Sequence, residues 1–433
     1  MSMYFLYGLL SADPSADLGR PDYALLPQQT QMELFIEKTG LPVSGAKEKI
    51  TGSYNDLVNW KSVTLNNQGE VVSFRFWHLK TAINLGELDF QLLPSTVERI
   101  DVYILKLEEE PTLSFHGLPS SLKSLEIPQS AFHGTLDTAC LPRQLEVINI
   151  RKNKFSGSLK AAHLPQTLQV LLVHCNRFSG PLDFPALPPD MRQLNISNNE
   201  FSGSVDLTRL SKTIELLIIH TNEFSGVIDL SALPPRRMND HYGSNDLTLI
   251  GFSVGNNRFD TLLWKSISKR VERIDAGTNA LKGPFEAMVL PSQLKVLKVN
   301  NNQYEGPLSL KDLPPGLRFL DASSNRLSGQ LDLTVLPSDM QILLLSKNAF
   351  EGSLDFSWLP KRFEQLDLSS NGITGPMAEI TFGKTHLQLK SIDLSDNKIC
   401  EDRVRVVGML SKWATIDLRG NEIGSANRPN VKI

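Results

Sequence analysis

Residues 164–207 read LPQTLQVLLVHCNRFSGPLDFPALPPDMRQLNISNNEFSGSVDL, and this stretch gives nearly the same pattern twice. Each copy begins with Leu-Pro, continues with apolar residues spaced by polar ones up to an asparagine, and then gives Phe-Ser-Gly. The two asparagines, Asn176 and Asn199, are 23 residues apart. A period of roughly 20 to 50 residues indicates a repeat architecture, so the chain is best divided in this frame before any domain is drawn.

The closing asparagine recurs along most of the 433-residue chain. It falls at Asn153, Asn176, Asn199, Asn222, Asn257, Asn279, Asn302, Asn325, Asn348, Asn371, Asn397 and Asn421. Weaker copies further upstream place Ser130, Leu105 and Leu79 in the same slot. About 15 units therefore follow one another, and a run of this length with steady spacing does not arise by chance.

The residue types of one unit predict its local structure. The alternation of leucines with other residues has the period of a β-strand, so the leucines face one side. The asparagine amide can bond backbone groups where the chain leaves the strand, and the glycine of Phe-Ser-Gly allows a second bend. Stacked units bury the apolar face that one unit cannot bury alone. We therefore expect the recurring phenylalanines to stack as an internal spine: Phe155, Phe178, Phe201, Phe224 and Phe350.

These units resemble leucine-rich repeats, which have an L-x-x-L-x-L-x-x-N core and a period of roughly 20 to 29 residues. The Phe-Ser-Gly tail is similar to the plant-type subclass, and the L-D-L-x-x-L-P variant is most similar to leucine-rich repeat proteins of kinetoplastid and euglenid protists. The resemblance implies a β-dominated solenoid of the α/β type, curved, with a parallel sheet on its concave face and few regular helices. It implies little about function, because this fold serves many functions.

The repeat frame divides the chain into three parts. Residues 1–70 are expected to form an N-terminal extension and cap, residues 71–424 the solenoid, and residues 425–433 a C-terminal tail. The solenoid carries one insertion of twelve residues, 235–246, which should lie on a rim loop. Residues 404–410, near the C-terminal end, are expected to be helical.

Composition and cysteine content indicate an intracellular protein, either cytoplasmic or within an organelle assembly. The net charge of −3 argues against non-specific binding to nucleic acid, and no apolar run approaches the roughly 18 residues of a membrane span. The start of the chain is a poor signal peptide because no basic residue precedes its short apolar run. Caps of plant-type repeats commonly carry two cysteines, whereas Val58 and Leu65 occupy those slots here. Cys140, Cys175 and Cys400 therefore read as free thiols in a reducing compartment.

The outward-facing strand positions are the candidate binding surface. Most are small or charged, but larger side chains of the kinds found at protein contacts stand out. They are Trp77, Tyr103, Val147, Arg151, Val170, Leu172, His174, Leu216, Ile218 and His220, with a second apolar group of Val296, Phe319, Ile342 and Leu344. The insertion adds Arg236, Arg237, Met238 and Tyr242 as candidate contacts. The alternative interpretation is drift on a scaffold surface, since single exposed apolar residues are common.

Two ladders of polar residues have both a functional and a structural interpretation. One slot in three consecutive units holds an aspartate: Asp367, Asp393 and Asp417. These residues either form a docking strip for a basic partner or are simply the usual residue at that position of this repeat. His174 and His220 lie two units apart, on the order of 10 Å, which is too far to share a metal ion. We therefore expect no catalytic residue, no cofactor and no metal.

The sequence thus predicts a non-catalytic scaffold for protein–protein interaction, acting as a subunit or adaptor of a larger assembly. Its expected partners are other proteins, and no nucleic acid, membrane span or small-molecule substrate is expected. The alternative is an extracellular or membrane-associated recognition receptor. A secretory signal on the complete gene would favour the receptor, whereas co-purification with other subunits in fixed stoichiometry would favour the assembly.

Overall fold

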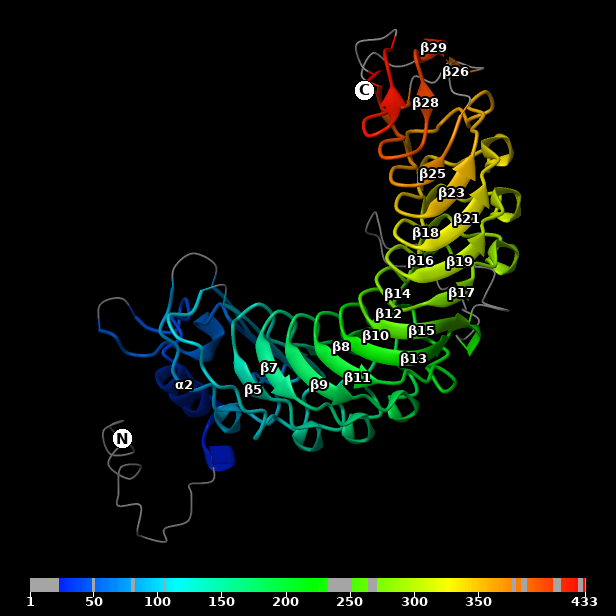
Figure 1. Ribbon diagram of the computed structural model, residues 1–433. Coiled ribbons are helices and arrows are strands. Elements are labelled where there is room, and N and C mark those ends of the chain that lie inside the picture. The colour runs from blue at the N-terminus through cyan, green and yellow to red at the C-terminus, as the bar shows by residue number, and fades with distance from the viewer. Residues whose placement is uncertain are drawn as a thin grey trace.

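The computed structural model describes residues 23–48, 51–78, 82–104, 106–232, 251–263, 271–375, 379–382, 388–407, 414–426 and 431–432. These residues form a curved solenoid, with α2 (Gln28–Thr39) at one end of the arc and the C-terminal strands at the other (Figure 1). Successive turns each add a strand to a parallel sheet that lines the inside of the arc. The predicted β-dominated solenoid with a parallel sheet on its concave face is confirmed.

The concave sheet contains 17 strands within the described ranges. At its N-terminal edge, β1 (Val63–Leu65) pairs antiparallel with β2 (Val71–His78). The later strands run parallel in chain order: β3 (Arg99–Ile104), β4 (Ser124–Glu126), β6 (Val147–Asn149), β8 (Val170–Leu172), β10 (Gln193–Asn195), β12 (Leu216–Ile218), β14 (Gly251–Ser253), β16 (Arg273–Asp275), β18 (Val296–Lys298), β20 (Phe319–Asp321), β22 (Ile342–Leu344), β24 (Gln365–Asp367), β27 (Ser391–Asp393), β30 (Thr415–Asp417) and β32 (Val431–Lys432).

Further short strands run along the flank of the solenoid, where the Phe-Ser-Gly segments lie (Figure 1). The sequence suggested only a bend there. The glycine does adopt a positive φ, 85° at Gly157 and 78° at Gly180, but the backbone around it also pairs with the next turn. The flanking strands are β5 (His133–Thr135), β7 (Lys154–Gly157), β9 (Arg177–Pro181), β11 (Glu200–Gly203), β13 (Glu223–Asp229) and β15 (Arg258–Leu263), then β17 (Lys282–Pro284), β19 (Gln303–Pro307), β21 (Arg326–Gln330), β23 (Ala349–Gly352) and β25 (Gly372–Ile373).

The outer side of many turns is a 3₁₀ helix of three residues, because Leu-Pro ends each such segment and prevents a longer helix. These helices are η3 (Phe90–Leu92), η4 (Thr138–Cys140), η5 (Ala161–His163), η6 (Phe184–Ala186), η7 (Leu230–Ala232), η8 (Ala287–Val289), η9 (Leu310–Asp312) and η10 (Leu333–Val335). In the N-terminal region, η1 (Tyr23–Leu25) precedes α2 and η2 (Leu57–Asn59) precedes β1.

The recurring asparagine joins each turn to its neighbours. The Nδ2 group of Asn176 donates to the carbonyl oxygens of Val173 in its own turn and Ile150 in the turn before, both at 3.0 Å. Its Oδ1 atom accepts a hydrogen bond from the backbone nitrogen of Phe155, also at 3.0 Å. The same three contacts recur at Asn199. The predicted bonding of the asparagine amide to the backbone is therefore confirmed.

The phenylalanine spine forms inside the N-terminal part of the solenoid. Phe155, Phe178, Phe201 and Phe224 stack in sequence with ring centroids 6.1 to 6.5 Å apart, within the range of favourable aromatic pairs. Phe259 extends the stack by one further ring. Phe350 is also fully buried, but aliphatic residues occupy the equivalent slots on both sides of it, so it stands apart from the stack.

The two ends of the apolar core are closed in different ways. At the N-terminal end, the ring of Phe35 in α2 packs edge-on against Phe74 of β2 at 5.3 Å, and Trp60 is almost fully buried. At the C-terminal end, β26 (Glu379–Thr381) pairs with β29 (Arg405–Val407), and β28 (Cys400–Glu401) with β31 (Glu422–Ile423). The helix expected over residues 404–410 is wrong for 405–407, which pair as a strand, and 408–410 lie outside the described part. In the regions covered by the structure, no helix is both long and apolar enough to cross a lipid bilayer.

Candidate binding face

The parallel register aligns equivalent side chains of neighbouring strands into columns across the concave face. In one column, Val147 pairs with Val170, Val170 with Gln193, and Gln193 with Leu216. In the next column, Leu172 pairs with Asn195, and Asn195 with Ile218. The structure thus brings together five apolar candidates as one patch on β6, β8 and β12. We call this group the upstream patch: Val147, Val170, Leu172, Leu216 and Ile218.

The side chains of the upstream patch are half-buried, whereas the aliphatic residues between them, Ile148, Leu171 and Leu217, are buried in the core. Each strand therefore presents alternate residues to opposite sides, as the period of two requires. The strand β10 interrupts the patch with Gln193 and Asn195. The Oδ1 atom of Asn195 accepts hydrogen bonds from the backbone nitrogen and the hydroxyl of Ser197, at 3.1 and 2.7 Å, so this amide has a fixed orientation.

Two residues beyond the ends of the strands β6, β8 and β12, one edge of the upstream patch is bordered by Arg151, His174 and His220. Burial, together with the positive charges of Arg151 and Lys152, lowers the pKa of His174 to about 4. Burial also lowers the pKa of His220, whose Nδ1 atom lies 3.0 Å from the hydroxyl of Thr221. Both rings are therefore neutral at pH 7, and this edge of the patch carries less charge than three basic side chains would suggest.

The second apolar group lies further along the same face. Val296, Phe319 and Ile342 pair directly on three successive strands, β18, β20 and β22, and Leu344 is two residues beyond Ile342 on β22. We call these four residues the downstream patch. The ammonium group of Lys298 lies 6.0 Å from the centroid of the Phe319 ring, within reach of a cation–π contact. Unlike the upstream patch, this column has no polar interruption.

The aromatic candidates near the cap lie apart from the upstream patch. Trp77 pairs with Tyr103 across β2 and β3, and Trp77 is 67% exposed. The hydroxyl of Tyr103 donates to Oε1 of Gln129. The strand β4 then intervenes, where Glu126 accepts a hydrogen bond from Arg99 at 2.5 Å. A charged pair therefore separates the aromatic candidates from the aliphatic ones.

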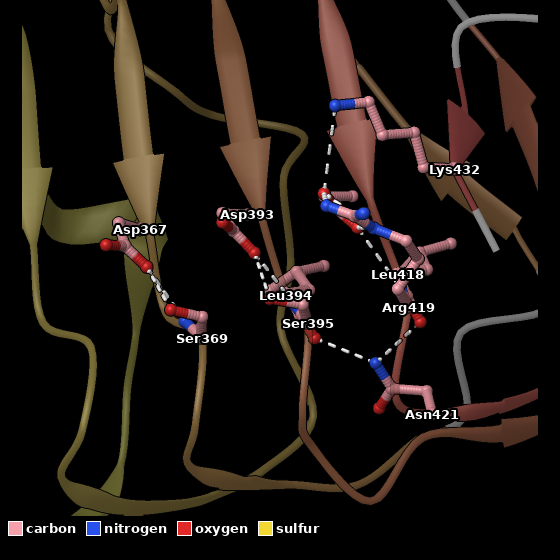
Figure 2. Close-up of polar contacts among 10 residues, drawn as sticks. Asp367, Ser369, Asp393, Leu394, Ser395, Leu418, Arg419, Asn421 and Lys432 are labelled. Carbon is pink, nitrogen blue, oxygen red and sulfur yellow. Dashed lines mark hydrogen bonds and ion pairs between the residues drawn. The ribbon is translucent and has the colours of Figure 1, made fainter.

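The acidic column at the C-terminal end is largely held by its own repeat (Figure 2). Asp367 pairs with Asp393, and Asp393 with Asp417, as expected. Oδ1 of Asp367 accepts from the backbone nitrogen and hydroxyl of Ser369, at 3.0 and 2.7 Å, and Asp393 makes the same two bonds within its turn. The guanidinium of Arg419 binds Asp417 and lowers the pKa of its carboxyl group. These contacts favour the structural interpretation of the aspartates over the docking strip.

The four insertion candidates, Arg236, Arg237, Met238 and Tyr242, lie outside the described residues, so their placement remains a prediction. The structure also reveals apolar side chains on the outer side that sequence reasoning missed. Met288 of η8 is 75% exposed, Trp358 is 62% exposed, and Val335 of η10 is 40% exposed. A cavity of about 490 Å³ opens beside Trp358 and Leu336. For Trp358, the signal in the sequence was its position directly before a Leu-Pro pair, Leu359 and Pro360.

Comparison with known proteins supports the fold but goes no further. No protein-family model and no curated protein matches the sequence. Among solved structures, the chain is similar to the plant peptide hormone receptor RGFR1 in complex with RGF2, with a TM-score of 0.56 and 20% identity. The match covers 75% of this chain but only 57% of the receptor chain.

Two further solved structures are similar at lower TM-scores. The Arabidopsis receptor kinase HAESA, in complex with the peptide hormone IDA and the co-receptor SERK1, gives a TM-score of 0.43 at 16% identity, covering 92% of this chain and 86% of that one. The leucine-rich repeat domain of APL1B gives 0.48 at 20% identity, covering 70% and 86%. The stacked parallel strands, the asparagine ladder and the likeness to RGFR1 together establish that this chain has the fold of a leucine-rich repeat solenoid.

Proposed function

We propose that this chain is a non-catalytic protein-binding scaffold and that the upstream patch is its main contact with a partner protein. The observation that carries the proposal is the shared column of Leu172 and Ile218 on the concave face. Both side chains point away from the core and remain partly exposed. Apolar side chains gathered on the open face of a sheet are typical of a surface that another macromolecule covers.

The size of the patch indicates how it contributes to binding. Leu172 and Ile218 lie two strands apart, about 10 Å. A patch of this width covers only part of the area of about 800 Å² that a stable interface buries on each partner. The patch therefore acts as a central anchor, and the neighbouring side chains form the surrounding contact. The neutral state of His174 at pH 7 supports this role, because an uncharged ring is less costly to remove from water than a charged one.

We further propose that the scaffold is an intracellular subunit or adaptor of a larger assembly. Support comes from the cap, where Val58 and Leu65 replace the two cysteines common in plant-type caps, and from the three unpaired cysteines. The second candidate is a recognition receptor, which the likeness in fold to RGFR1 favours. A receptor would use the same concave face, so both candidates share the first experiment.

That experiment compares partner capture by the wild-type chain and by a chain carrying Leu172→Asp and Ile218→Asp. Tagged proteins are used to capture partners from native extract, and mass spectrometry quantifies what is retained. We expect the double variant to keep the wild-type circular dichroism spectrum, since both side chains point outward. We expect it to lose its partners, because it places two unpaired charges in a contact that excludes water.

A matched control makes the same chemical change on the opposite side of the solenoid. Met288→Asp with Val335→Asp also replaces two exposed apolar residues, and these also lie two turns apart, in η8 and η10. We expect this control to retain its partners. If the concave variant retains them at wild-type yield, the upstream patch is not the main interface. Partners that co-purify in fixed stoichiometry favour the assembly subunit, whereas capture of a secreted peptide favours the receptor.

A further inference from the structure

A second cluster of functional side chains lies on the outer side of the solenoid, away from the concave face. His116, Asp137 and Cys140 come from two neighbouring turns, and one potential ligand atom from each lies within 4.8 Å of the others. The sulfur of Cys140 is 3.2 Å from Nδ1 of His116 and 3.2 Å from Oδ2 of Asp137. Within the described ranges, this is the one group of three or more such side chains that lie close enough to share a metal ion.

The local structure explains why these three side chains meet. Asp137 precedes η4 and Cys140 ends it, and side chains three residues apart in a 3₁₀ helix lie one above the other. Oδ1 of Asp137 accepts a hydrogen bond from the backbone nitrogen of Ala139 at 3.0 Å, which leaves Oδ2 directed at the sulfur. His116 follows Phe115, whose buried ring packs against Phe155 at 5.5 Å and so fixes the backbone next to the histidine.

The scaffold accounts for the aspartate but not for the other two residues. Asp89 and Asp332 cap η3 and η10 through the same bond to a backbone nitrogen two residues on. Three positions after these two aspartates the side chain is apolar, Leu92 or Val335. Three positions after Asp137, the side chain is that of Cys140. The combination of thiol, imidazole and carboxylate is therefore particular to η4.

We propose that His116, Asp137 and Cys140 form a binding site for a divalent ion of the zinc class. Sulfur and imidazole ligands select zinc-like ions over magnesium and calcium, which prefer oxygen. Zinc bonds of about 2.0 to 2.3 Å place the ligands of a tetrahedral site on the order of 3.5 Å apart, close to the separations found here. Binding exchanges the thiol proton of Cys140 for a metal–sulfur bond, and the proton leaves to solvent.

The site supplies three protein ligands and leaves the fourth position to water. His116 and Asp137 are exposed and Cys140 is half-buried, so solvent reaches the ion directly. Structural zinc sites are usually closed by four protein ligands. We therefore expect this ion to bind reversibly to the folded chain, without being required for folding. The assignment does not depend on the function proposed for the concave face.

The test uses the full chain, reduced and stripped of metal by a chelator, and titrates it with cobalt(II) as a spectroscopic substitute for zinc. We expect one equivalent of cobalt to produce a sulfur-to-cobalt charge-transfer band and visible bands of tetrahedral intensity. Zinc should then displace the cobalt. Cys140→Ser should abolish the charge-transfer band, and His116→Gln should weaken cobalt binding roughly tenfold or more, while circular dichroism confirms that both variants are folded.

Two controls separate metal binding from capping and from the other thiols. Asp332→Asn makes the same change from carboxylate to amide at the equivalent cap of η10, and the combined Cys175→Ser and Cys400→Ser variant removes the other cysteines. We expect both to bind cobalt as the wild type does. Asp137→Asn should weaken binding where Asp332→Asn does not. A wild-type chain that gives no charge-transfer band, or a band that survives Cys140→Ser, would overturn the assignment.

Discussion

Oδ1 of Asn257 accepts a hydrogen bond from the backbone nitrogen of Phe224 at 3.1 Å, although 33 residues separate the two. The equivalent bond from Phe201 to Asn222 spans 21 residues. The series of hydrogen bonds to the recurring asparagine thus continues across the insertion, and β12 pairs directly with β14. The ring of Phe224 also stacks on that of Phe259 at 6.4 Å. The turns before and after the insertion are therefore joined by contacts that do not involve the twelve extra residues.

From this continuity we expect that deleting residues 235–246 leaves the solenoid folded. Shortening a loop by twelve residues changes its closure entropy by less than about 1 kcal/mol, whereas the contacts between turns are kept. Urea unfolding followed by circular dichroism should give one transition for both the full and the shortened chain. If limited proteolysis at the insertion releases two folded halves that separate, the solenoid is not one cooperative unit.

The sequence predicts those parts of the fold that repeat with the chain. The alternation of leucines places Leu171 and Leu194 in the core, and the fixed slot of Asn176 predicts its bonds to the backbone. Such features depend on residue type and period alone. The expected helix failed over Arg405–Val407, because the local pattern of apolar residues does not reveal that this segment has a partner strand at Glu379–Thr381.

The features that the sequence did not reveal depend on how turns stack in space. His116 lies 24 residues before Cys140, and nothing in the spacing alone says that the two side chains point toward one another. The separation of Trp77 and Tyr103 from the upstream patch likewise arises from one intervening strand and its charged pair. The sequence therefore predicts which candidate residues face outward on neighbouring strands, whereas a contact between side chains of different turns, such as that of His116 with Cys140, required the structure.

Replacement of one ladder asparagine should destabilise the whole solenoid. Asn199→Ala removes three donated bonds and the bond accepted from the backbone nitrogen of Phe178. The carbonyl oxygens that lose a donor belong to Val173, Ile196 and Ser197. Each buried backbone group left without a partner costs about 1 to 3 kcal/mol, so we expect a loss of several kcal/mol in the free energy of unfolding. Urea denaturation measures it. Glu200→Ala, at an exposed neighbouring position, is the control and should change the free energy by less than about 0.5 kcal/mol.

One substitution should stabilise the chain by relieving strain in the backbone. The residue before each of many ladder asparagines adopts a left-handed conformation, with φ of 54° at Thr278 and 52° at Asn256. Asparagine tolerates this region, whereas a β-branched side chain is strained in it. Thr278→Asn should therefore raise the free energy of unfolding by about 1 kcal/mol. Thr415→Asn, within β30, makes the same chemical change in an extended strand and should not stabilise. Equal effects at both positions would contradict the explanation by backbone strain.

The buried ring of His174 should make stability depend on pH on the acidic side of neutrality. Its pKa is lowered from 6.5 to about 4 in the folded chain, so between these values the unfolded chain binds the proton and the folded chain does not. The free energy of unfolding must then fall as pH drops through this window, and the contribution is lost below about pH 4. The full shift corresponds to about 3 kcal/mol, which the partial exposure of the ring reduces to about 1 kcal/mol.

Urea denaturation of the wild type and of His174→Gln from pH 7 to pH 4 tests this dependence directly. The wild type should lose stability more steeply, and the two curves should differ in total fall by about 1 kcal/mol. Burial also lowers the pKa of His220, so adding His220→Gln should flatten the curve again. His163→Gln alters a ring that is exposed in the folded chain, and this control should follow the wild type. A wild-type slope in His174→Gln would mean that the acid sensitivity comes from other groups, because removing the ring must remove its share of the proton linkage.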